Sequence, residues 1–232
     1  MGAVSTVLAP VFGSATGASR ALLDCDAAVR VPSPLCRRIG FVHLAPGIGG
    51  STTAARVATV LARRRAGMVL AVDASPSPRA LLPLLGTPTA GNEPAGTTAA
   101  EIRADLARAP GGCYALDLRP ANDWSATVGP IARFFDVVVT DWGLRHPAYD
   151  LEPVLTGSHA VCLVVRAGDA AAAVLLQSLQ GRPATPPVVV ALLGGDRGRL
   201  PGPVVVVGPG PRHSLRLAAE LMRPTGGDRR DR

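Results

Sequence analysis

The sequence predicts one α/β domain in which helices cover both faces of a mostly parallel sheet. Short apolar runs alternate with helix-like stretches from about residue 37 to residue 223. Some of these runs, such as Val188–Val190 and Val204–Val207, are continuously β-branched instead of alternating with polar residues. Continuous runs are typical of strands buried on both faces, and βαβα alternation is typical of parallel sheets. At 232 residues and 47% hydrophobic composition, the chain is long and apolar enough for one such core.

The expected elements follow one another in a doubly wound order. Strands are expected at Ile39–Leu44, Met68–Asp73, Cys113–Leu118, Asp136–Asp141, Ala160–Arg166, Val188–Leu193 and Val204–Val207. Helices are expected between them at Ser51–Arg65, Ala99–Ala109, Ala126–Phe134, Ala170–Leu179 and His213–Arg223. An earlier short helix is expected near Ser19–Val29, because Pro32 and Pro34 interrupt regular structure beyond it. The segment Gly86–Thr98, rich in Thr, Pro and Gly, predicts an exposed loop.

We therefore divide the chain into an N-terminal extension (1–36), an α/β domain (37–223) and a polar tail (224–232). The first twenty residues lack a basic region before their apolar stretch, and no run approaches the ~18–20 apolar residues of a membrane span, so neither a signal peptide nor a transmembrane segment is expected. The four cysteines are widely spaced, which argues against a zinc site or a disulfide framework and fits a reducing compartment. We expect a cytoplasmic protein, with peripheral membrane association through a partner as the alternative.

All 24 basic residues are arginine, and the chain contains no lysine. This excludes every mechanism that needs a lysine: a Schiff base, a lysine general base, or a P-loop lysine on the phosphates. The net charge of +7 and the isoelectric point near 10.5 permit weak, non-specific contact with nucleic acid or anionic lipid. With only 2 Trp, 2 Tyr and 4 Phe, the chain has few rings on which bases could stack. Sequence-specific nucleic-acid recognition is therefore not expected.

The most informative segment is the turn after the first expected strand, which reads Ala-Pro-Gly-Ile-Gly-Gly-Ser-Thr over residues 45–52. Glycines let backbone N–H groups converge on a phosphate, and a helix N-terminus adds partial positive charge. Ser51 can ligate Mg²⁺ or cap the following helix. Many α/β proteins use such glycines merely to turn the chain, however. Thr52 also stands where a dinucleotide-binding G-x-G-x-x-G turn needs its third glycine.

Two acidic strand ends give this turn a context. Asp73 ends the second expected strand, and Asp141 ends a later buried strand before Trp142-Gly143. In order and spacing the three motifs resemble the MinD/ParA family of deviant Walker-A ATPases, which carry K-G-G-x-G-K-[ST]-T, a D-x-D-like motif and Y-D-x-x-x-x-D. The resemblance spans about residues 37–223 and implies a three-layer αβα, P-loop NTPase-like fold. It implies nucleotide-binding positions at Gly47, Gly49, Gly50, Ser51, Thr52, Asp73 and Asp141, with Ser51 and Asp141 as the residues that would face Mg²⁺.

The departures from the family pattern are equally specific. The signature lysine falls on Ala45 and the phosphate-binding lysine on Gly50, while Pro46 replaces a glycine N–H with a ring that has none. Ser75 stands where the family has the acid that helps to position the attacking water. Losing one donor of this kind typically costs ~10²–10³-fold in rate. We therefore expect an ATPase-shaped domain that hydrolyses ATP poorly or not at all, with no catalytic residue assigned and no cofactor required.

The predicted function is a non-hydrolysing scaffold or regulatory partner, of the kind that the family supplies in spatial positioning, pilus assembly or type VII secretion. Its expected partner is a protein: a second copy of the chain or membrane-associated machinery. One alternative is a working Mg-ATPase that uses an unrecognised arginine, for which Arg56 is nearest to the turn in the sequence. The other is an Arg-rich, non-specific DNA-binding partition protein.

Two more residues, His43 and Trp142, lie next to the predicted site in the sequence. His43 is expected to be a core or sheet-face histidine, because it lies within the first expected strand. Trp142 is expected at the ligand-binding edge of the sheet. There it could fill the space of an absent nucleotide, contact a partner, or simply pack in the core.

Overall fold

The structure is a computed structural model, which describes residues 5–33, 35–65, 68–77, 81–87, 94–118, 123–146, 150–180, 182, 185–195 and 200–224; of residues 5–15 and residue 180 only the backbone is described. The strands are β1 (Arg37–His43), β2 (Val69–Asp73), β3 (Ala107–Arg108), β4 (Tyr114–Asp117), β5 (Val137–Leu144), β6 (Ala160–Arg166), β7 (Val188–Leu193) and β8 (Val204–Val207). The helices are α1 (Ser5–Arg30), α2 (Gly50–Arg64), α3 (Leu81–Leu85), α4 (Ala99–Asp105), α5 (Trp124–Ala132), α6 (Glu152–Gly157), α7 (Ala170–Gln180) and α8 (Pro211–Met222).

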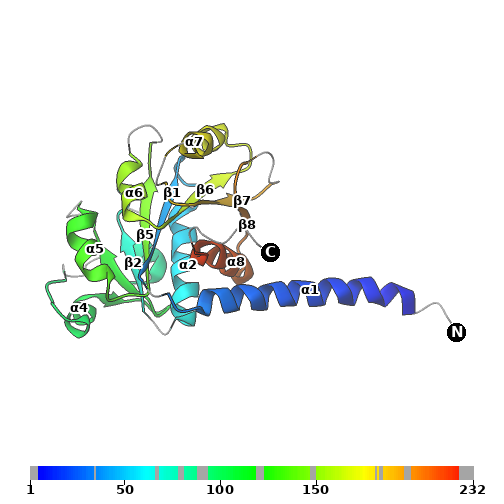
Figure 1. The fold of residues 1–232 in the computed structure, drawn as a ribbon, viewed down its shortest axis with the longest axis horizontal. Helices are drawn as coiled ribbons and strands as arrows, with labels where there is room; N and C mark the ends of the chain where they lie inside the picture. Colours follow the sequence, from blue (N-terminus) through cyan, green and yellow to red (C-terminus); the bar gives the residue numbers. More distant parts are fainter. Residues whose placement is uncertain are drawn as a thin grey trace.

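The strands form one eight-stranded sheet in the order β3-β4-β2-β5-β1-β6-β7-β8 (Figure 1). Every neighbouring pair is parallel except β3 and β4. Helices α2, α3 and α8 bury their apolar side chains against one face, and helices α4 to α7 bury theirs against the other. The predicted three-layer αβα architecture with a mostly parallel sheet is confirmed.

The position of β1 explains why the glycine-rich turn lies at the centre of the molecule. β1 pairs with β5 on one side and with β6 on the other. Strands β2, β3 and β4 lie beyond β5, and β7 and β8 lie beyond β6, so the sheet is built outward from its centre in two opposite directions. In open α/β sheets, such a change of direction leaves a crevice outside the carboxyl ends of the strands. The segment between His43 and Gly50 leaves β1 at this point and enters α2.

Several predicted elements differ from those observed. The helix expected over Ala99–Ala109 ends at Asp105, because Ala107–Arg108 pair antiparallel with β4 and residues 110–112 make a tight turn between them. Three short elements, α3, α6 and β3, were not predicted. The loop expected at Gly86–Thr98 lies partly, at residues 88–93, outside the described residues, as does most of the polar tail.

The N-terminal helix is much longer than the predicted Ser19–Val29. It runs from Ser5 to Arg30, and its first half extends beyond the rest of the domain (Figure 1). The second half packs on α8 and α2, where Val29 is completely buried. Among the helices of the described residues, none combines the length and apolar composition needed to cross a bilayer.

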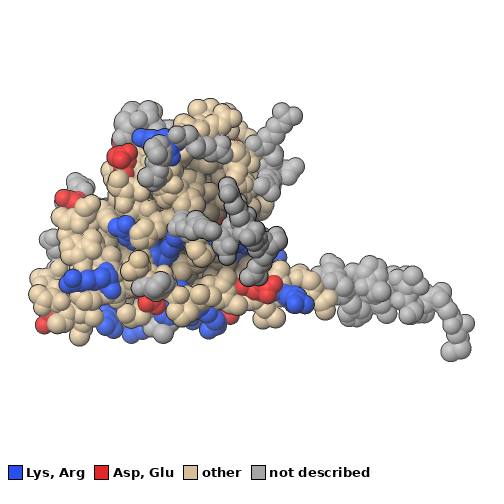
Figure 2. Space-filling view, in the orientation of Figure 1, with Lys and Arg blue, Asp and Glu red and all other residues tan. Residues whose placement is uncertain are grey.

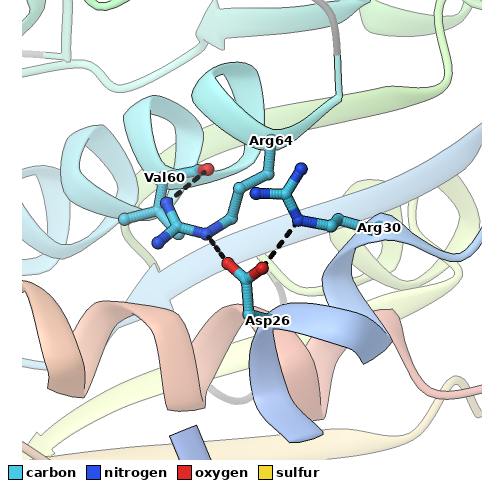
Figure 3. Close-up of polar contacts among 4 residues, drawn as sticks. All are labelled: Asp26, Arg30, Val60 and Arg64. Atoms are coloured by element: carbon cyan, nitrogen blue, oxygen red, sulfur yellow. Dashed lines mark hydrogen bonds and ion pairs between the residues drawn. The ribbon is translucent and has the colours of Figure 1, made fainter. Parts of the chain in front are cut away.

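A charged contact ties α1 to the end of α2 (Figure 3). Asp26 accepts a hydrogen bond from Arg64 Nε at 2.6 Å and a second one from Arg30 Nε at 2.6 Å. Arg64 also lies 3.4 Å from the carbonyl oxygen of Val60, through Nη1. The extension is therefore attached to the same helix that begins at the glycine-rich turn.

Candidate functional site

The glycine-rich turn has a backbone that only glycine adopts easily. Gly47 and Gly49 have φ angles of 68° and 92°, in the left-handed region. Gly49 is the N-cap of α2 and provides no side-chain cap, while its carbonyl oxygen accepts bonds from Thr53 N at 2.9 Å and Thr53 Oγ1 at 2.8 Å. The helix N-terminus that follows therefore keeps the partial positive charge that attracts an anion.

Aspartates stand side by side at the carboxyl ends of neighbouring strands. Asp73 on β2 is in register with Asp141 on β5 and, on its other side, with Asp117 on β4. Paired positions on neighbouring strands project from the same face of the sheet. The three aspartates therefore lie on one face, at the end where these strands finish. Asp117 was not singled out in the sequence, although it ends an apolar run as the other two do. Within the described residues, no group of three or more His, Cys, Asp or Glu side chains is arranged to hold a metal ion.

Asp73 has a structural role in this row. Its Oδ1 accepts a hydrogen bond from Ser75 N and its Oδ2 one from Leu82 N, both at 3.3 Å. Ser75 is itself buried, and its hydroxyl accepts a bond from Ser77 N at 3.2 Å. Asp73 thus fastens the chain that follows β2 to the edge of the sheet.

Asp141 differs from Asp73 because half of its carboxyl is unused. The side chain is fully buried, and Oδ1 accepts a bond from Gly143 N at 3.0 Å. Oδ2 has no hydrogen-bond partner among the described residues. Burial raises the pKa of Asp141, opposed by the nearby Ser51 hydroxyl, the Gly143 N–H, His43 and Arg145. The structure therefore places the Ser51 hydroxyl beside the Asp141 carboxyl.

His43 is a sheet-face histidine, as expected, and its ring lies beside the glycine-rich turn. Its ring is half-buried, and Nδ1 lies 2.9 Å from the carbonyl oxygen of Ala45. A Cβ atom on Gly50 would overlap with His43 Cδ2 and lie 3.1 Å from both Cγ and Nε2. The ring therefore lies directly against the backbone at the start of α2. The sequence signal was the position of His43 as the last residue of β1.

The arginines nearest to the turn come from distant parts of the chain. Arg56, the candidate chosen by sequence distance, is exposed on α2. Arg166, at the end of β6, instead places Nη2 3.5 Å from the carbonyl oxygen of Gly47. Arg145 follows β5 and donates from Nη2 to Ala74 O at 3.2 Å. Burial lowers the pKa of Arg145, and the carboxylates of Asp150 and Asp141 oppose that shift, in that order.

Trp142 packs in the core, which was one of its three interpretations. It is 4% exposed and belongs to the face of the sheet covered by α4 to α7. Its ring centroid lies 6.2 Å from that of Trp124. The helix that begins at the glycine-rich turn covers the opposite face. The contacts of Trp142 are therefore those of a core side chain.

The residues around the turn fit a magnesium ion better than a triphosphate. A hydroxyl and a free carboxylate oxygen, from Ser51 and Asp141, are the hard oxygen ligands that Mg²⁺ prefers. The phosphate half lacks its usual groups, because the chain has no ammonium side chain and Pro46 has no N–H to donate. The His43 ring moreover lies against Gly50, the position that carries a lysine in the family pattern.

Comparisons with known proteins agree with this architecture. No protein-family model matches the chain, and no curated protein sequence matches it. Among solved structures, a ParA family ATPase from Chlorobium tepidum matches with a TM-score of 0.60 and 18% identity, over 82% of this chain and 91% of that one. MinD in the MinC:MinD cell division complex of Aquifex aeolicus matches with a TM-score of 0.54 and 18% identity, over 79% and 86%. Cobyrinic acid a,c-diamide synthase from Mycobacterium smegmatis, solved with ADP and magnesium, matches with a TM-score of 0.53 and 17% identity, over 80% and 93%.

The strand order and the turn at the end of β1 give the chain a P-loop NTPase-like α/β fold. Within that class, its fold is of the MinD/ParA type. At these levels of sequence identity the neighbours establish the fold, while nucleotide chemistry has to be argued from the residues of this chain.

Proposed function

We propose that this chain is a MinD/ParA-type protein with a degenerate nucleotide site, which acts as a non-hydrolysing scaffold or regulatory partner. The observation that carries the proposal is the content of the turn. The phosphate-cradle backbone is kept at Gly47 and Gly49, but a histidine ring lies where the family pattern places a lysine. Phosphoryl transfer depends on positioned cations and a positioned water, and the chain has neither Walker lysine nor an acid at Ser75.

The proposed partner is a protein. The MinD neighbour was solved in a complex with MinC, which supports a protein-binding role for a domain of this shape. Spatial positioning, pilus assembly and type VII secretion are the settings that the resemblance suggests for such a scaffold. Homodimerisation and peripheral attachment to membrane-associated machinery belong to the same proposal.

Titration with a fluorescent ATP analogue, with and without Mg²⁺, tests the proposal. We expect no saturable binding up to about 100 µM analogue, and no inorganic phosphate release above that of buffer. A Kd below about 10 µM together with turnover would overturn it. A catalytically active MinD/ParA-type ATPase, measured in parallel, is the positive control.

A working ATPase that uses arginine is the second candidate, and the position of Arg166 favours it over the version based on Arg56. The guanidinium of Arg166 contacts the Gly47 carbonyl oxygen and is solvent-exposed, so it can turn toward an anion at the turn. If ATP binds, Arg166→Ala should weaken binding by ~10-fold or more, while Arg56→Ala should leave it unchanged. Equal effects of the two substitutions would contradict this candidate.

Non-specific DNA binding is the weaker alternative. Figure 2 shows the arginines of one face in several separate groups with acidic side chains among them, and not as one continuous basic surface. A DNA-binding role predicts affinity that falls steeply as salt rises from about 50 to 200 mM. Affinity that is absent at low salt would remove this alternative.

A further inference from the structure

Gly50 is a glycine for a reason different from that of Gly47 and Gly49. Those two residues have positive φ angles, whereas Gly50 does not. Gly50 is the first residue of α2, where the backbone accepts residues with a Cβ atom. The backbone conformation at position 50 therefore does not require glycine. The reason for a glycine here is the lack of space beside it.

That space is filled by His43. A Cβ atom at position 50 would overlap with His43 Cδ2 and crowd Cγ and Nε2 at 3.1 Å. The ring is held in place by its contact with Ala45 O at 2.9 Å, within the same turn. Swinging the ring away would break that contact. A side chain at position 50 and the observed position of the His43 ring therefore exclude each other.

We propose that the imidazole of His43 is a built-in occupant of the glycine-rich turn, and that it prevents any side chain at position 50 from entering the site. This inference rests on the proposed function, since it explains how the turn keeps its shape without a phosphate-binding cation. It has a direct consequence: the missing lysine cannot be restored at position 50 while His43 is present. Two substitutions are needed, one to remove the ring and one to add the cation.

An alanine cycle tests the contact itself. Gly17 in α1 provides the control, because nothing lies within 4 Å of an added Cβ there, its φ is not positive and no proline follows it. We expect Gly17→Ala to leave Tm unchanged or raise it by up to about 4 °C, and Gly50→Ala to lower it by roughly 2–8 °C. In a His43→Ala background, Gly50→Ala should no longer lower Tm. A Gly50→Ala effect that is the same with and without His43 would overturn the proposal.

A lysine cycle tests the consequence. Binding of the fluorescent ATP analogue with Mg²⁺, and of inorganic pyrophosphate, is measured for His43→Ala alone, for Gly50→Lys alone and for His43→Ala/Gly50→Lys. We expect the double variant to bind at least ~10-fold more tightly than either single variant. Equal binding by Gly50→Lys with and without His43 contradicts the exclusion. Tight binding and turnover by the unmodified protein would refute the proposed function, while the alanine cycle would still decide the contact.

Discussion

Asp73 and Asp141 occupy paired positions on neighbouring strands and are both fully buried, but only Asp73 has backbone donors on both carboxyl oxygens. Asp141 keeps Oδ2 without a hydrogen bond in the described part of the chain. Burial raises the pKa of Asp141, so its charged form lowers the stability of the fold at neutral pH.

The two aspartates should therefore respond in opposite directions to the same substitution. Asp141→Asn removes a buried charge, and we expect it to raise the free energy of unfolding by about 1 kcal/mol at neutral pH. Asp73→Asn loses an acceptor for a backbone N–H and should lower it by about 1–2 kcal/mol. Urea unfolding of the two variants measures both effects. Destabilisation by Asp141→Asn as large as that by Asp73→Asn would contradict this interpretation.

The gain from Asp141→Asn should depend on pH. Because burial raises the pKa of Asp141 above its unfolded value of 3.8, the contribution of this carboxyl is most favourable below pH 3.8 and is lost as pH rises through the folded pKa. The asparagine variant has no such loss. Its advantage over the unmodified protein should therefore be near zero at about pH 4 and largest at neutral pH and above. Tm measured across this range should show the gap widening; a constant gap would argue against titration of Asp141.

Gly143 is constrained by both its backbone and its neighbour. Its φ angle is 71°, β5 carries one extra residue opposite β1 here, and an added Cβ would overlap with the Ser75 side chain. Gly143→Ala should cost about 2–4 kcal/mol. Gly168→Ala is the control, because its φ angle of 82° imposes similar backbone strain but nothing lies within 4 Å of an added Cβ. It should cost only about 1 kcal/mol, so equal losses in chemical denaturation would rule out the Ser75 contact as the cause.

At the scale of whole elements, the contact of Asp26 with Arg64 joins α1 to α2, while Arg30 binds the same carboxylate from within α1. Hydrogen bonds from these two arginines hold the pKa of Asp26 below its ordinary value. Because the folded pKa is lowered, the contact stabilises the protein above pH 3.8 and is lost as pH falls through the folded pKa. Both partners are partly exposed, so its contribution is modest, about 0.5–1 kcal/mol.

Asp26→Asn should therefore loosen α1 without unfolding the domain. We expect faster amide hydrogen exchange over residues 16–30 and a drop in Tm of about 1–4 °C at neutral pH, which disappears in acid. Asp24→Asn, at an exposed position on the same helix, is the control and should change neither quantity. Unchanged exchange in the Asp26 variant would show that apolar packing alone holds α1.

Strands were easier to predict than short helices, for a physical reason. Residues 160–166, 188–193 and 204–207 are runs of β-branched and apolar residues, and the structure places β6, β7 and β8 at those bounds. The helices α3 and α6 span only 5 and 6 residues, too few to show a helical period. The first half of α1 contains Pro10 and two glycines, which argued against a helix there. Local propensity was in this case a poor guide to the fold.

At the scale of the molecule, the candidate site was predicted in part. Motif order and spacing were enough to bring the turn, Asp73 and Asp141 to one edge of the sheet, because strand order in this fold makes those strand ends neighbours. The roles of His43 and Arg166 could not be predicted in the same way. Arg166 meets Gly47 across 119 residues of chain, and His43 matters only because Gly50 faces its ring. Contacts of this kind depend on side-chain packing, which a motif does not encode.

The chain combines a MinD/ParA-type fold with a glycine-rich turn that contains no lysine, and the central proposal is that this turn does not hold Mg-ATP. Its most direct test is the thermal stability of the unmodified protein with and without about 5 mM Mg-ATP. A ligand with a Kd near 10 µM would add about 3–4 kcal/mol at that concentration, or roughly 6–16 °C in Tm. We predict a shift within about 1 °C of that given by an equal concentration of magnesium chloride and sodium phosphate. A rise of several degrees that requires both Mg²⁺ and ATP would contradict the central claim.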